Sequence, residues 1–357
     1  MSPLEQLEKV APEKKERLDV DLLIDKMYRT LTHYMVEDNV PFYPDQKVIE
    51  KDALGKMRDA LRSDALTVSD ETLEALNGLN NEAKQTFNSQ VMARATKELW
   101  QDPEIKKSFS LDNIVVVLVG LSYAMKLEKQ IEDSSGKEKI FGDFRISYES
   151  RQFMGSFGGD VAVIHEHQDG LTAIVLDAAG KDINASVNKA LLLGFLPYDR
   201  QIKFADIVEA EKKLLKTNFY ETNKFITMAL VNIGNDGYTS VVSCGGTIAL
   251  QQNGSIYDDF EQSKLVFLGY EGRDVAEKDS SWTGERVNLG SGDKLILYTD
   301  GVQDFYTPKL RNRHLSSDEL FRGKETKDSR ELLVETARIP ESLSRRDDYT
   351  VMVIEKV

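Results

Sequence analysis

The spacing of apolar residues divides the chain near residue 140. Before that position, apolar side chains recur three and four residues apart, which is the spacing of one face of an α-helix. The segments with this pattern are residues 18–36, 47–62 and 71–100. The sequence therefore predicts an all-helical N-terminal domain over residues 1–139.

The longest apolar run of this region covers residues 114–121. Its five β-branched residues favour a strand, whereas the apolar continuation through Met125, Leu127 and Ile131 favours a helix. We favour the helix, and we expect it to link two domains over about residues 111–133. A stripe this apolar also predicts a dimer contact, unless it packs within its own helical bundle.

After residue 140 the turn signals are those of β-hairpins. Asp169-Gly170, Asp236-Gly237 and Asn253-Gly254 each lie between apolar or β-branched runs. Two helical patterns, residues 184–196 and 204–218, lie between the first two turns. Residues 140–357 are therefore expected to form an α+β domain with mostly antiparallel sheets and helices on the outer faces, rather than a doubly wound parallel sheet.

The composition narrows the possible partners. A formal net charge of −14 and a pI near 5.0 disfavour a general nucleic-acid or anionic membrane surface, and favour proteins and cations. The apolar run at 114–121 is too short for a membrane span, which needs about 20 residues. Residues 1–17 contain no apolar run typical of a secretory signal, and Cys244 is the single cysteine. These features predict a cytoplasmic protein.

Four acidic sites carry the candidate chemistry, each beside a strand-like run. They are Asp160, Asp177, Asp300 and the pair Asp347-Asp348. Any one of them fits an ordinary turn. Together, if the fold gathers them, they make an oxygen-rich site suited to Mg²⁺ or Mn²⁺.

The order of these sites along the chain is characteristic. The pieces are Gly158-Gly159-Asp160, Leu176-Asp177-Ala178-Ala179-Gly180, Ser243-Cys244-Gly245-Gly246, Tyr298-Thr299-Asp300-Gly301-Val302 and Asp347-Asp348-Tyr349-Thr350. In this order they make residues 141–357 resemble the SpoIIE/RsbU-like branch of the PPM-type metal-dependent serine/threonine phosphatases. The resemblance implies a β-sandwich flanked by helices, αββα, with two Mn²⁺ or Mg²⁺ ions between the sheets.

The resemblance also implies roles for individual residues. Asp177 is expected to bridge both ions, with the carbonyl oxygen of Ala178 as a further ligand. Asp160 is expected to bind one ion, and Asp300 and Asp347 the other. Asp348 is expected to support the ligands rather than to bind metal. Two such ions can activate water for attack on a phosphate ester without a covalent intermediate.

The implied activity is hydrolysis of phosphoserine or phosphothreonine on a regulatory protein. The resemblance points to a STAS-type anti-anti-sigma factor in bacterial partner switching, and to an upstream regulator acting on the N-terminal helices. The alternative is a catalytically silent phosphoprotein-binding or scaffold module of the same fold.

Two other candidate sites are weaker. Cys244 lacks the arginine six residues later that a thiolate phosphatase needs, because Leu250 stands there. His165 and His167 share one strand face, but two ligands are fewer than a zinc site usually has.

Overall fold

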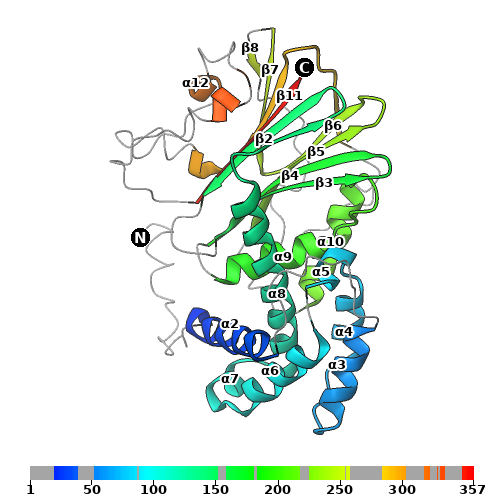
Figure 1. The fold of residues 1–357 in the computed structure, drawn as a ribbon, viewed down its shortest axis with the longest axis vertical. Helices are drawn as coiled ribbons and strands as arrows, with labels where there is room; N and C mark the ends of the chain where they lie inside the picture. The colour runs from blue at the N-terminus through cyan, green and yellow to red at the C-terminus, as the bar shows by residue number, and fades with distance from the viewer. Residues whose placement is uncertain are drawn as a thin grey trace, which may run out of the picture.

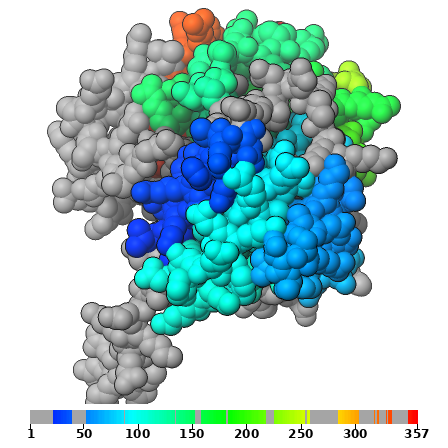
Figure 2. Space-filling view, turned by 60° about the horizontal axis from the view of Figure 1, so that its bottom comes forward, coloured from blue at the N-terminus to red at the C-terminus, as the bar shows by residue number. Residues whose placement is uncertain are grey.

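The N-terminal helices and the β-sheets occupy opposite ends of the molecule (Figure 1). The structure is a computed structural model. It describes residues 20–38, 52–86, 88–151, 158–180, 183–217, 225–253, 255–257, 284–302, 317–321, 328, 330–333 and 348–357. One face of the molecule is formed largely by helices near the N-terminus, coloured blue to cyan in Figure 2.

Side-chain caps explain where several N-terminal helices begin. The helices are α2 (Val20–Glu37), α3 (Ala53–Arg62), α4 (Asp70–Asn77), α5 (Asn81–Lys84), α6 (Ser89–Gln101), α7 (Pro103–Ser108) and α8 (Leu111–Ser134). The side chains of Ser69, Asn80, Asn88, Asp102 and Ser110 each accept a hydrogen bond from a backbone N–H in the first turn. These bonds satisfy amides that have no partner within the helix.

Helix α8 contains the apolar run whose conformation the sequence left ambiguous. The helix prediction is confirmed, and α8 packs against α2, α6 and α9 (Ile183–Phe195). Because it is enclosed on several sides, its side chains are apolar all round and give little helical periodicity. Leu118 and Leu121 are fully buried within the single chain. Packing within one chain therefore accounts for their apolar character, as in the alternative considered from the sequence, and a dimer contact at α8 stays a prediction.

The strands form two antiparallel sheets. The strands are β1 (Glu138–Phe141), β2 (Phe144–Arg151), β3 (Asp160–His167), β4 (Gly170–Ala178), β5 (Ile226–Gly234), β6 (Thr239–Cys244), β7 (Thr247–Gln252), β8 (Ser255–Tyr257), β9 (Glu285–Val287), β10 (Lys294–Tyr298) and β11 (Tyr349–Lys356). Within the described residues, one sheet has the order β1-β2-β11-β10-β7-β8 and the other β3-β4-β5-β6-β9. The hairpins predicted at residues 169–170 and 236–237 join β3 to β4 and β5 to β6.

The two sheets pack face to face with helices outside them. Side chains such as Leu295 and Met352 from one sheet and Val175 and Val231 from the other share a buried cluster. Helices α9 and α10 (Phe204–Lys216) cover the outer face of the second sheet, and α12 (Ser317–Phe321) lies on the first. This arrangement confirms the predicted α+β class and the αββα sandwich.

The N-terminal helices are continuous with the sandwich in their packing. One apolar cluster runs from α2 through α8 and α9 to side chains of β4 and β5. None of the helices in the described ranges combines the length and apolarity that crossing a membrane requires.

Candidate metal centre

Two of the predicted ligands lie side by side because a hairpin brings them together. The tight turn at residues 169–170 pairs β3 with β4 so that Asp160 and Asp177 are direct partners across the ladder. Just beyond the ladder, the amide of Ala178 donates to the carbonyl oxygen of Gly159 at 3.1 Å. A sequence separation of 17 residues therefore becomes a single cross-strand pair.

The other sheet contributes the end of β10 and the start of β11. The hydroxyl of Thr299 donates to Oδ2 of Asp160 at 2.6 Å, and the amide of Thr350 donates to the same hydroxyl oxygen at 2.9 Å. The amide of Gly159 donates to Oδ2 of Asp348 at 2.8 Å. Asp300 directly follows Thr299 and is exposed. The edges of both sheets thus meet at the aspartates.

Two glycines permit this close approach of backbone segments. A Cβ on Gly159 would lie 2.2 Å from the carbonyl oxygen of Ala178, and one on Gly301 would lie 1.8 Å from that of Asp348. Neither distance leaves room for a side chain. The glycines that flank the aspartates in the sequence are therefore needed for the two sheet edges to meet.

Asp160 is a buried carboxylate with several acidic side chains nearby. Asp160 is only 2% exposed, and burial raises its pKa well above the usual range. The neighbouring charges of Asp177, Asp348 and Asp300 raise the pKa further. The hydrogen bond from Thr299 acts in the opposite direction. A buried carboxylate among three others is chemically suited to a hard divalent cation.

The described side chains fit a cation in charge and donor type, but they do not by themselves complete a ligand cluster. Among the described residues, no three Asp, Glu, His or Cys side chains are arranged so that they could hold a metal ion. Asp347, which the sequence analysis assigned as a ligand, lies outside the described residues.

The weaker candidates take other roles. Cys244 is fully buried at the end of β6. His165 lies 3.2 Å from a carboxylate oxygen of Glu82 and stacks on Tyr198, whereas His167 contacts Thr172 at 3.2 Å. The two histidines therefore do not converge on a common ligand.

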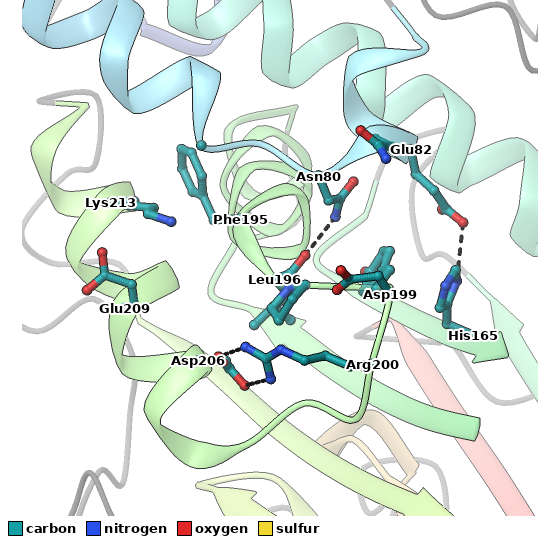
Figure 3. Close-up of a pocket in the computed structure, with 14 residues that line it drawn as sticks. Asn80, Glu82, His165, Phe195, Leu196, Asp199, Arg200, Asp206, Glu209 and Lys213 are labelled. Carbon is teal, nitrogen blue, oxygen red and sulfur yellow. Dashed lines mark hydrogen bonds and ion pairs between the residues drawn. The ribbon is translucent and has the colours of Figure 1, made fainter. Parts of the chain in front are cut away.

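A pocket of about 600 Å³ lies where the N-terminal helices meet the sandwich (Figure 3). The side-chain amide of Asn80 donates to the carbonyl oxygen of Leu196 at 3.0 Å, and Arg200 forms a two-bonded ion pair with Asp206. The pocket wall includes both acids and bases, so its charge does not select one class of ligand.

Sequence analysis missed Lys189, a fully buried lysine of α9. Its ammonium group contacts the turn that precedes and includes Asp160. The only signal in the sequence is a charged residue within segment 187–196, in which Asn188 is the one other polar side chain.

An antiparallel αββα sandwich with aspartates where the sheet edges meet is the architecture of the PPM-type phosphatases. The family profile described as "Stage II sporulation protein E (SpoIIE)" matches residues 167–357, more than half of the chain, and the chain belongs to this family. The matched residues include Asp177 and Asp300 but begin after Asp160.

Several solved structures are similar to the sandwich at low identity. The SiaA-PP2C domain of Pseudomonas aeruginosa is 15% identical, with a TM-score of 0.41, over 59% of this chain and 85% of that chain. The PP2C phosphatase domain with a regulatory fragment of SpoIIE from Bacillus subtilis is 17% identical, with a TM-score of 0.40, over 59% and 63%. RsbX in complex with magnesium is 17% identical, with a TM-score of 0.40, over 62% and 99%. A search of curated proteins found no match.

Proposed function

We propose that this protein is a metal-dependent phosphatase of phosphoserine or phosphothreonine on a regulatory protein. The observation that carries the proposal is the buried Asp160 carboxylate, whose pKa is raised by burial and by the charges of Asp177, Asp348 and Asp300. A site that collects like charges in a buried position is unfavourable unless a cation binds there. Membership of the SpoIIE family supports the same chemistry.

The proposed ligands are Asp160, Asp177, Asp300, Asp347 and the carbonyl oxygen of Ala178. When bound, two Mn²⁺ or Mg²⁺ ions supply Lewis acidity toward the phosphoryl oxygens and toward the attacking water. The chain itself provides rigid placement of the donors.

Thr299 has a clear part in that placement. Its hydroxyl donates to Oδ2 of Asp160 and accepts from the amide of Thr350, so it fixes one carboxylate oxygen relative to β11. Asp348 has a comparable part, because it accepts from the Gly159 amide and ties the turn before β3 to the start of β11. We propose that Asp348 acts through this bond and not as a ligand.

The biological setting is also a proposal. We infer a STAS-type anti-anti-sigma factor as the phosphorylated substrate, in the cytoplasm, from the family alone. Residues 1–139 would form a regulatory domain that receives an upstream partner, residues 140–357 the phosphatase, and a homodimer the assembled form.

Phosphate release from a phosphoserine protein tests the enzymatic proposal. With the full chain, release should require Mn²⁺ or Mg²⁺ and stop on chelation. Asp177→Asn and Asp300→Asn should each lower the rate by about 100-fold or more, because each removes an anionic donor. Cys244→Ser is the control and should keep most activity. Turnover that survives chelation and both aspartate changes, but is lost in Cys244→Ser, would refute the metal mechanism.

The alternative is a catalytically silent module that binds a phosphoprotein. The same experiment separates the two functions. A silent module would bind the phosphorylated protein and release no phosphate at any concentration of Mn²⁺.

A further inference from the structure

Lys189 is a fully buried lysine whose ammonium group has three hydrogen-bond acceptors around it. Nζ lies 2.6 Å from Oε1 of Glu128, 2.7 Å from the carbonyl oxygen of Gly158 and 2.8 Å from that of Asp160. An ammonium group has three donors, so these contacts use all of them. A buried lysine is rare unless it is paired in this way.

Two of the three acceptors belong to the turn that includes Asp160. The carbonyl groups of Gly158 and Asp160 flank Gly159, and the hydroxyl of Ser186 donates to Gly158 as well, at 2.8 Å. On another side, the amide of Gly159 donates to Asp348. Glycines cannot hold their own conformation by side-chain packing. The shape of this turn therefore depends on the donors that α9 supplies and on Asp348.

The third acceptor comes from outside the sandwich. Glu128 lies on α8, 61 residues before Lys189, and its side chain is 12% exposed. It precedes the first strand and the region that the family profile matches. The negative charge that accompanies the buried lysine is thus supplied by the helix that joins the N-terminal helices to the sandwich.

We propose that Lys189, held by Glu128, is a positioning residue of the metal centre that fixes the backbone carrying Asp160. This inference rests on the proposed function, since it concerns the same centre. Groups that orient metal ligands usually change metal affinity by about 10- to 100-fold when they are removed. Lys189 does so through two carbonyl groups, while Thr299 holds the carboxylate itself.

Binding of Mn²⁺ to the full chain tests the proposal without relying on turnover. The electron paramagnetic resonance signal of free Mn²⁺ gives the dissociation constant, and Mn²⁺-dependent thermal shifts give a second measure. Lys189→Met keeps the length of the side chain and removes its donors. We expect it to weaken Mn²⁺ binding by about 10- to 100-fold. Glu128→Gln, which keeps an acceptor and removes the charge, should weaken binding by a smaller factor.

Matched controls come from an exposed ion pair on the same helix α8. Lys129 contacts Glu132 at 2.9 Å, and neither side chain contacts the turn. Lys129→Met and Glu132→Gln should therefore leave the dissociation constant within about twofold, as expected for exposed positions away from the centre. If Lys189→Met does not fold, the double variant Glu128→Gln/Lys189→Met, which buries no unpaired charge, replaces it under the same criteria.

The outcomes distinguish this inference from the proposed function. Wild-type protein that neither binds Mn²⁺ nor releases phosphate overturns the proposed function. Wild-type binding with an unchanged dissociation constant in a folded Lys189 variant overturns the positioning role alone. Weaker binding, together with activity that returns at excess Mn²⁺, supports it.

Discussion

Helices α8 and α9 approach each other closely at Gly120. We therefore predict that the effect of Gly120→Ala on stability changes sign with the residue opposite. A Cβ added at Gly120 would lie 2.7 Å from Cγ1 of Val187 and 3.2 Å from Cγ of Leu191. Ordinary carbon contacts are about 3.5–4.0 Å. Gly120→Ala would therefore push the two helices apart locally by about 0.8–1.3 Å, unless the Val187 side chain moves.

Val187 has little freedom to move. It is fully buried, and a β-branched side chain in a helix is held in one strongly preferred rotamer. Overpacking of this kind costs about 1–3 kcal/mol, whereas replacing glycine by alanine within a helix gains about 1 kcal/mol. In the wild-type background, Gly120→Ala should therefore lower the free energy of unfolding by up to about 2 kcal/mol.

The same change should be stabilising when Val187 is replaced by alanine. Val187→Ala removes the atom at 2.7 Å, and a small movement of Leu191 can accommodate the remaining contact. Gly120→Ala should then raise the free energy of unfolding by up to about 1 kcal/mol, so the coupling energy of the two changes should be about 1–3 kcal/mol.

Urea unfolding of the four metal-free proteins, followed by far-UV circular dichroism, measures this cycle. Equal m-values among the four are the condition for comparing their free energies. An equal effect of Gly120→Ala in both backgrounds would refute the close contact. Because Glu128 and Lys189 lie on the same two helices, the Gly120→Ala single variant should also bind Mn²⁺ more weakly than the double variant.

Three further predictions concern other contacts. Asp160→Asn should stabilise the metal-free protein by about 0.5–2 kcal/mol, because it removes a buried carboxylate next to like charges, while abolishing Mn²⁺ binding. Because folding raises the pKa of Asp160, the protonated side chain favours the folded state at low pH. This stabilisation is lost as the pH rises through the folded-state pKa. Urea unfolding at several pH values should show the advantage of Asp160→Asn growing with pH, and an advantage that shrinks would contradict the raised pKa. Gly301→Ala should destabilise the protein by about 1–3 kcal/mol and weaken Mn²⁺ binding, because the new methyl group would overlap the carbonyl oxygen of Asp348. Thermal melts with and without Mn²⁺ measure both effects. Unchanged melting temperatures would show that the two segments can separate freely. Asn80→Ala should cost about 1–3 kcal/mol in urea unfolding, because it removes the cap of α5 and the donor to the end of α9. Asn80→Asp keeps the cap but places a carboxylate against the same carbonyl oxygens, so it should cost no less, and a smaller cost would show that the cap alone matters.

Local turn chemistry explains why much of the sandwich could be predicted from the sequence. An Asp-Gly pair between β-branched runs specifies a hairpin, so the turn between β3 and β4 could be predicted from adjacent residues. The structure adds that this pairing places Asp160 opposite Asp177. The pairing of β11 with β2 did not follow. In that pairing the hydroxyl groups of Ser150 and Thr350, 200 residues apart, approach to 2.7 Å, and no local periodicity encodes such a contact.

The burial of polar groups was the least predictable feature. Lys189 lies in an apolar helical pattern, where a lysine would ordinarily mark the solvent side, but here all of its donors have acceptors within the protein. The dimer contact expected along α8 stays a prediction, and Leu118 and Leu121 show a related difficulty because they are already buried within the single chain. Periodicity shows that a stripe will be covered, but it does not show whether the covering surface comes from the same chain.

The position of the acidic centre follows from backbone edges rather than from a dedicated loop. Asp160 begins β3, Asp177 is the second-last residue of β4, and Asp300 follows β10, so each carboxylate is placed by a strand that also builds the core. Such placement is rigid, but it gathers like charges that oppose folding while no cation is bound. The neutral contacts from Thr299 and the charged contact from Lys189 to the surrounding backbone must offset that repulsion. Because the partner of Lys189 belongs to α8, the stability of the metal-free centre depends on the N-terminal helices as well as on the sandwich.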